Sequence, residues 1–178
     1  MSDELNQLQA RFERLNQLYQ VSQVIHSTLD PQKALQLVVS EAVRLVGGNS
    51  GSVVLVNPGG MLEIEAAHGL PEEARQLQLR VGQGITGWVA RSGRPARVGD
   101  VRQDARYVAA RPEVRSELAV PLEVAGELRG VLNVDSDRGD AFSESDQELL
   151  QAMAVQAAGV IHRNPASGHN IIYSTVRV

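Results

Sequence analysis

The chain has 178 residues, with 17 basic against 21 acidic side chains, a net charge of −4 and no cysteine. The absence of cysteine excludes disulfides, thiolate chemistry, zinc–thiolate sites and iron–sulfur clusters in this chain. No cluster of Lys or Arg stands out and no run approaches the roughly 18 apolar residues of a membrane span, so we expect neither direct binding of nucleic acid nor membrane insertion. The N-terminus is polar and lacks the apolar centre of a signal peptide, and the sequence therefore predicts a soluble cytoplasmic protein.

Residues 3–28 have the pattern of one long amphipathic helix. Its apolar residues recur at spacings of 3, 4, 3 and 4, which is the pattern of a coiled-coil seam: Leu5, Leu8, Phe12, Leu15 and Tyr19. About two heptads leave two interpretations open, a helix that packs on its own domain or one that pairs with its copy in a second subunit. We favour a homodimer, with residues 1–28 as a signalling helix, because this segment lies outside the sheet-forming region.

Two further helices are predicted. Asp30 is suited to cap the first of them and Pro31 to occupy its first turn, while Gly47-Gly48 ends it. The second begins at Ser143, where Asp146 three residues later completes a capping-box-like pair, and it ends at Asn164-Pro165.

Between these helices the pattern changes to short strands. Two hairpins are predicted, 52–56 with 61–67 and 117–124 with 128–136. A short helix near 71–77 and a strand near 79–81 lead to a glycine-rich block, and 98–115 has no clear periodicity and is expected to be an ordered long loop. Helices at both ends of a hairpin-rich centre indicate an α+β domain with helices on one face of the sheet.

Three blocks of sequence resemble the signature of a GAF domain, a small-molecule sensing module. They are Gly82-Gln83-Gly84-Ile85-Thr86-Gly87-Trp88-Val89-Ala90-Arg91-Ser92-Gly93, Ser116-Glu117-Leu118-Ala119-Val120-Pro121-Leu122 and Gly130-Val131-Leu132-Asn133-Val134-Asp135-Ser136. The resemblance extends from about Leu18 to His162 and places the domain at 29–163, with 164–178 as a tail or linker. It implies a PAS-related, six-stranded antiparallel sheet with terminal helices on one face and a ligand pocket over the other. Family members typically precede output modules such as a kinase, phosphatase, cyclase or transcription activator, which implies a sensor in a bacterial regulator.

Residues 84–122 are also similar to free methionine-R-sulfoxide reductases, which share this fold and use cysteines. At the two sulfur positions this chain has Thr86 and Ala110. Neither a hydroxyl nor a methyl group can form a sulfenate or a disulfide, so we predict that the chain is not an enzyme of this type, and no other catalytic motif is evident.

The resemblance also suggests residues for a binding site. Glu117 and Asp135 match carboxylates that hold the substrate ammonium group in those reductases, which implies an amine or amino-acid ligand. The alternative is that both acids are strand-end hydrogen-bonding residues, as in GAF domains of unrelated specificity. Trp88 and Tyr107 are expected on the pocket side.

Other ligand classes have little support in the sequence. Gly82-x-Gly84-x-x-Gly87 lacks the βαβ setting of a dinucleotide site, and no counterpart of the Asn-Lys-Phe-Asp-Glu signature of cyclic-nucleotide binders is present. His68 is expected in a turn rather than as a haem ligand, and no histidine pair has metal-binding spacing. We therefore predict no cofactor and no metal.

Two functions remain. The first is a regulatory sensor that binds a small molecule or partner and relays this through dimeric terminal helices. The second is a non-catalytic dimerisation or protein-interaction domain without a small-molecule ligand, whose pocket is filled by its own side chains. The aromatic content of 3% favours the second, because small-molecule pockets are usually lined by aromatic residues.

Overall fold

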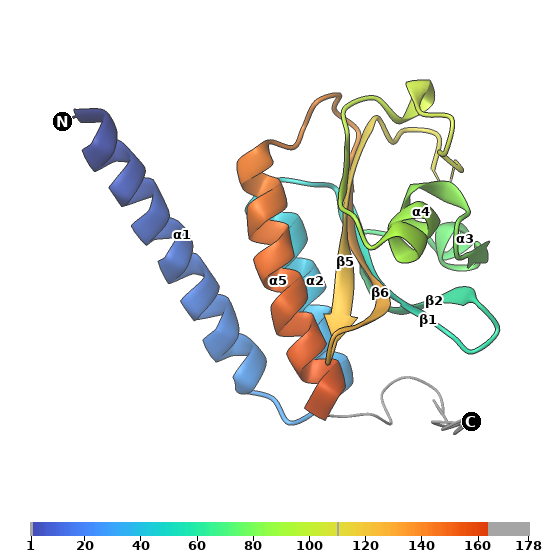
Figure 1. Cartoon of the computed structure of the whole chain (residues 1–178), viewed down its shortest axis with the longest axis horizontal. Coiled ribbons are helices and arrows are strands. Elements are labelled where there is room, and N and C mark those ends of the chain that lie inside the picture. Colours follow the sequence, from blue (N-terminus) through green and yellow to red (C-terminus); the bar gives the residue numbers. More distant parts are fainter. Residues whose placement is uncertain (1, 110, 164–178) are drawn as a thin grey trace.

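A six-stranded antiparallel sheet lies at the centre of the protein, and the computed structural model describes residues 2–109 and 111–163 around it (Figure 1). The strand order is β3-β2-β1-β6-β5-β4, so the central β1 pairs with β2 and β6, and β6 pairs in turn with its hairpin partner β5. The strands are β1 (Ser50–Val56), β2 (Met61–His68), β3 (Leu79–Arg80), β4 (Ala96–Val98), β5 (Ser116–Val124) and β6 (Glu127–Ser136). The helices are α1 (Ser2–His26), α2 (Pro31–Val46), α3 (Glu72–Arg75), α4 (Gly84–Ser92), the 3₁₀ turn η1 (Val101–Gln103) and α5 (Glu144–Arg163).

The sheet separates two layers of unequal size. Helices α2 and α5 cover one face, and the short helices α3 and α4 lie over the other (Figure 1). This confirms the predicted α+β class and the six-stranded sheet with its terminal helices on one face. In the part of the chain that the structure describes, no helix is long and apolar enough to cross a membrane.

Alternation along the strands explains why both faces are buried. In β5, Leu118, Val120 and Leu122 are buried in the cluster beneath α2 and α5, whereas Ala119 belongs to the cluster on the opposite face. Successive side chains of a strand point to opposite faces, so one strand supplies both cores.

The predicted start and end of α2 and the predicted start of α5 are present, whereas the predicted end of α5 at Asn164-Pro165 lies outside the described residues. The Asp30 carboxylate accepts hydrogen bonds from the backbone N–H groups of Gln32 and Lys33, and Gly47 ends α2 in the left-handed conformation at φ 70°. At the start of α5, Ser143 and Asp146 exchange side-chain hydrogen bonds with each other's backbone N–H groups, which is the capping box that the sequence predicted.

Helix α1 ends at His26 rather than at residue 28 and presents two different faces. Near its C-terminal end, Val21 and Ile25 are buried against the domain, with Leu18 packed beside them. The five residues of the predicted seam are instead 62–69% exposed, which excludes the interpretation that they pack on their own domain. In Figure 1 the N-terminal half of α1 extends beside the helical layer without covering it.

The segment 98–115 contains more regular structure than its sequence predicted. Its first residue belongs to β4, which pairs with β5, and η1 follows, capped by the Asp100 side chain. A three-residue edge strand and a single 3₁₀ turn are too short to produce a periodic pattern, so only the resemblance implied a sixth strand.

One central glycine provides a test of this packing. A Cβ atom at Gly130 in β6 would lie 2.0 Å from the carbonyl oxygen of Val54 in β1, and backbone in the middle of a sheet cannot easily move away. We expect Gly130→Ala to lower the free energy of unfolding by roughly 1–3 kcal/mol, as overpacked cores do. The control is Gly139→Ala, where the nearest atom lies at an ordinary 3.7 Å. Equal urea-unfolding midpoints for the two variants would contradict this packing.

Candidate functional site

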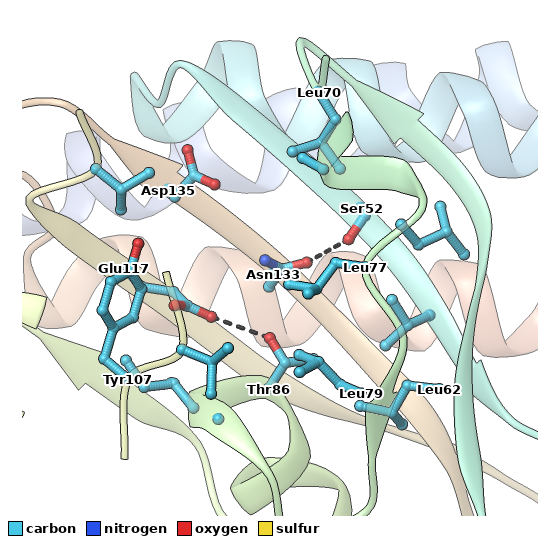
Figure 2. Close-up of a pocket in the computed structure, with 17 residues that line it drawn as sticks. Ser52, Leu62, Leu70, Leu77, Leu79, Thr86, Tyr107, Glu117, Asn133 and Asp135 are labelled. Atoms are coloured by element: carbon cyan, nitrogen blue, oxygen red, sulfur yellow. Dashed lines mark hydrogen bonds between the residues drawn. The ribbon is translucent and has the colours of Figure 1, made fainter. Parts of the chain in front are cut away.

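A cavity of about 90 Å³ lies between the sheet and the layer of short helices. Strands β1, β2, β5 and β6 form its floor, and residues from α3 and α4 complete its walls together with Tyr107, Val108 and Val114 (Figure 2). One part of the wall is apolar: Leu62, Ile64, Leu70, Leu77, Leu79 and Ile85. The other part is polar: Ser52, Thr86, Tyr107, Glu117, Asn133 and Asp135. The cavity therefore has an amphipathic lining.

Glu117 is one of two buried acidic side chains in the site. It lies at the start of β5, is 7% exposed, and accepts a 3.0 Å hydrogen bond from the Thr86 hydroxyl of α4. Burial raises the pKa of its carboxyl to about 7, and the hydrogen bond from Thr86 opposes this shift only in part. Near neutral pH the Glu117 carboxyl can therefore act as an acceptor or, when protonated, as a donor.

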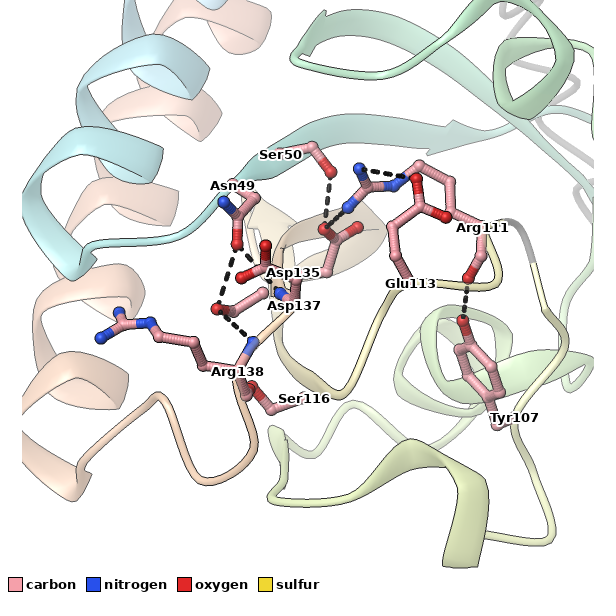
Figure 3. A network of polar contacts seen from close by, with 10 residues as sticks. Asn49, Ser50, Tyr107, Arg111, Glu113, Ser116, Asp135, Asp137 and Arg138 are labelled. Atoms are coloured by element: carbon pink, nitrogen blue, oxygen red, sulfur yellow. Dashed lines mark hydrogen bonds and ion pairs between the residues drawn. The ribbon is translucent and has the colours of Figure 1, made fainter.

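Asp135 lies directly opposite Glu117 in the β5–β6 register. Its Oδ1 accepts hydrogen bonds from the Ser50 hydroxyl and from Nη2 of Arg111, both at 2.6 Å (Figure 3). Burial raises the pKa of Asp135, while Ser50 and the charge of Arg111 act in the opposite direction. Because Arg111 neutralises Asp135, the two carboxyl groups of the site are held in different electrostatic environments.

The aromatic residues of the site have different positions. Tyr107 lines the cavity and its hydroxyl donates to the backbone carbonyl of Arg111 at 3.3 Å. Burial, followed by the charges of Glu117 and Asp135, raises the pKa of Tyr107 to about 12, so its hydroxyl keeps its proton. Trp88 packs in the adjacent apolar cluster, beneath the guanidinium of Arg106 at 4.5 Å, and is not among the residues that line the cavity.

The structure brings together three of the four residues singled out for a ligand. Glu117, Asp135 and Tyr107 line one cavity, whereas Trp88 lies behind its wall. The exposed stripe of α1 is separate from this site and lies beyond the helical layer (Figure 1).

Sequence reasoning missed several polar residues of the site. Thr86 was considered only as a replacement for a sulfur atom, and Asn133 only as part of a motif, yet both line the cavity. Asn133 accepts a 2.6 Å hydrogen bond from Ser52 on the neighbouring strand. Arg111 lies in a segment without periodicity, and no sequence signal connected it to Asp135.

The arrangement suits a small molecule with an apolar part and a polar head. Its polar part holds two carboxyl groups, three hydroxyl groups and the amide of Asn133, so hydrogen-bond donors on a ligand would find acceptors there. Among the described residues, no group of three or more His, Asp or Glu side chains has the arrangement of a metal site.

The raised pKa of Glu117 has a consequence for stability. Between the unfolded carboxyl value of about 4.5 and the folded value of about 7, the native state binds more protons than the unfolded state. The free energy of unfolding therefore falls as pH rises through this window, by roughly 3 kcal/mol for this group alone. We expect Glu117→Gln to remove this part of the dependence in urea titrations between pH 4 and pH 8.

A control is available on the same strand. Glu123 is exposed, so Glu123→Gln should keep the pH profile of the unmodified protein. A Glu117→Gln profile that superimposes on the unmodified one would show that Glu117 does not titrate as its burial requires.

Comparison with known proteins agrees with this architecture. The family model of the GAF domain matches residues 28–162. The Nif-specific regulatory protein of Azospirillum lipoferum is 32% identical over 148 residues, which are 77% of this chain but only 24% of that protein. The chain thus spans about a quarter of the length of this relative.

Two solved structures show the same fold. The GAF domain of a phosphoenolpyruvate-protein phosphotransferase from Coxiella burnetii superimposes with a TM-score of 0.79 at 24% identity, covering 87% of this chain and 96% of that one. The free methionine-R-sulfoxide reductase of Neisseria meningitidis, solved with its substrate, gives a TM-score of 0.75 at 25% identity, covering 83% and 89%. Since the family model matches most of the chain and the fold agrees, this protein belongs to the GAF domain family.

Proposed function

We propose that this protein is a regulatory GAF sensor that binds a small molecule in the cavity over the sheet and relays binding through the terminal helices of a homodimer. The observation that carries the proposal is the buried carboxyl of Glu117 in the cavity wall. Burying an ionisable group costs stability, and a domain that only needed to fold would be more stable with an apolar residue there. Perturbed ionisable groups in a cavity are typical of functional sites.

The lining supports a ligand of a few heavy atoms with an amine group. A cavity of about 90 Å³ is smaller than the roughly 300–1,000 Å³ of drug-sized pockets. An ammonium group would form charge-assisted hydrogen bonds with Glu117 or Asp135, and a short aliphatic part would contact Leu62 and Leu79. An amine or a small amino acid meets these requirements.

Contacts at the end of β6 support a relay from the cavity to the helices. The backbone N–H of Asn49 donates to the carbonyl of Asp135, and its side-chain oxygen accepts from the backbone N–H of Asp137 at 2.9 Å (Figure 3). Arg138 donates to the carbonyl of Gly47, the residue that ends α2. A ligand that favours one position of Asp135 shifts the packing of α2 by no more than its differential affinity.

The exposed stripe of α1 supports a homodimer. Five large apolar side chains at heptad spacing are more than half exposed, on a different face from the one that packs on the domain. Helix α1 is also held to α5, because Arg14 donates to Ser145 and forms an ion pair with Glu148 at 3.3 Å. A movement of α5 would thus reach the seam between two copies of α1.

A non-catalytic role is consistent with the relatives and the sequence. The matched relatives include regulators, and the chain has no cysteine at the positions where the reductases use one. We therefore propose that the domain works as the sensing part of a larger regulator.

The alternative is a dimerisation or protein-interaction domain without a small-molecule ligand. The small cavity and the internal partners of its acids favour it, because Thr86 already binds Glu117 and Arg111 already binds Asp135. Native mass spectrometry of freshly purified protein, repeated after mild denaturation, separates the two. We expect a dimer with a small-molecule increment that is lost on denaturation and is absent from Glu117→Gln. A dimer that never carries an increment, even after small amines are added, would support the alternative.

The seam can be tested by adding charge to it. Leu8→Glu with Leu15→Glu places like charges at two layers of the proposed interface, so we expect a monomer in sedimentation equilibrium at concentrations where the unmodified protein is dimeric. Asn6→Glu with Gln20→Glu adds the same charge at exposed positions outside the stripe and should remain dimeric. A folded dimer of the Leu8/Leu15 variant would rule out this seam.

A further inference from the structure

We propose that Arg111 is a tethered occupant of the Asp135 subsite, which the amine group of the ligand must displace. The guanidinium would hold the segment Arg111–Arg115, here named the strap, against the cavity until a ligand cation takes its place. This inference rests on the proposed function, because it concerns how the same cavity is opened and filled.

The contact between Arg111 and Asp135 has the geometry of a strong ion pair. Nη2 of Arg111 lies 2.6 Å from Oδ1 of Asp135, and both side chains are 11% exposed. Ser50 donates to the same oxygen, which fixes the carboxylate on β6 (Figure 3). Arg111 therefore supplies the positive charge that a ligand ammonium would otherwise supply.

Arg111 is also connected to residues that form the cavity wall. Val114, three positions further along the strap, lines the cavity and is 4% exposed. Tyr107 lines it too, and its hydroxyl binds the carbonyl of Arg111. The far end of the strap is fixed by the backbone hydrogen bond from Arg115 to Ser136 at 2.8 Å. Release of Arg111 would thus free one end of a wall whose other end stays attached.

The guanidinium of Arg111 is not completely satisfied where it lies. Its Nε is buried without a hydrogen-bond partner, and its other contact, to the exposed Glu113, is 4.0 Å long. A buried donor without an acceptor costs stability, and this cost is recovered when the group returns to water. Arg111 is therefore easier to displace than a fully bonded arginine would be.

The charge of Asp135, by contrast, makes Arg111 difficult to remove. A carboxylate buried in the cavity cannot lose the one ion-pair partner that it has among the described residues without a large cost, so Arg111 cannot simply leave. A ligand ammonium removes this cost because it provides a new positive charge and new donors. The ligand ammonium therefore replaces the Arg111 guanidinium at Asp135 in one exchange, and the cavity does not open before the ligand binds. A neutral molecule of the same shape cannot replace Arg111, because it brings no positive charge.

The test uses n-propylammonium as the cationic probe and 1-propanol as its neutral counterpart. Arg111→Met removes the competing charge, so we expect propylammonium to bind this variant at least about tenfold more tightly than the unmodified protein, since occupancy of a site by an internal competitor lowers apparent affinity. Calorimetry or the fluorescence of Trp88, the only tryptophan, can follow binding. The affinity for 1-propanol should not change between the two proteins.

Hydrogen exchange measures the strap without reference to any ligand. The amide of Val114, which donates to the carbonyl of Arg111, should exchange faster in Arg111→Met than in the unmodified protein, and propylammonium should accelerate it in the unmodified protein. The amide of Arg115, which is bonded to Ser136, should stay protected in both. Arg115→Met is the matched control, because Arg115 also has a buried Nε without a partner but forms no ion pair with Asp135 among the described contacts. It should bind propylammonium as the unmodified protein does.

Three results would overturn the proposal. They are equal affinity of propylammonium for the unmodified protein and Arg111→Met, unchanged strap exchange in Arg111→Met, and strap release without any binding of propylammonium. The last result would leave the proposed sensor role to the native-mass test, so the two failures are distinguishable. If Arg111→Met does not fold, Arg111→Met with Asp135→Asn removes the unpaired charge. In that case strap exchange should still rise while amine affinity does not.

Discussion

The alternation of side chains along β5 and β6 is the constraint on which the rest of the structure depends. Leu118 and Val134 lie in the core beneath the helices, while their chain neighbours Glu117 and Asp135 line the cavity on the other face. A shift of β5 by one residue against β6 would exchange the two faces of β5, placing Glu117 in the helical core and an apolar neighbour in the cavity. The position of the site and the stability of the helical core are thus fixed by the same pairing of two strands.

This arrangement places the apolar core that stabilises the domain on one face of the sheet and the buried acids that oppose stability on the other. The larger apolar cluster, under α2 and α5, contains no ionisable side chain, whereas the cavity face carries two buried acids. The hydroxyl of Thr86 and the guanidinium of Arg111 reduce the cost of those acids without removing it, because desolvation remains the largest effect on both. Residues that oppose stability in this way are more readily explained by function than by folding.

The features that could be predicted from the sequence are those marked by a periodic pattern of apolar residues or by helix-capping residues. Heptad spacing predicted the stripe of α1, and Asp30 and Ser143 predicted helix starts. The resemblance offered two roles for Glu117 and Asp135, in a ligand site or as strand-end hydrogen-bonding residues, and both residues line the cavity.

The features of the site that could not be predicted from the sequence are contacts between segments that lie far apart in the chain. Arg111 reaches Asp135 across 24 positions of sequence, and Thr86 reaches Glu117 across 31. No period or cap connects such pairs, and only the packed fold brings them together. Trp88 shows the converse, because an aromatic residue inside a family motif need not face the cavity: it packs behind the wall, where Arg106 covers its ring.

The close packing at the end of β6 determines how a movement of Asp135 in the cavity can be transmitted to α2. A Cβ atom at Gly48, just after α2, would lie 2.2 Å from a methyl group of Val134 and 3.0 Å from the carbonyl of Asp135. With no free space between them, a displacement of Asp135 along β6 must move the end of α2 or be resisted by it. The size of any signal is then set by how much a ligand prefers one position of Asp135, since a ligand indifferent to that position shifts nothing however tightly it binds. In the proposed exchange, the ion pair between Arg111 and Asp135 would supply such a preference, because Asp135 would change its partner when a ligand fills the cavity.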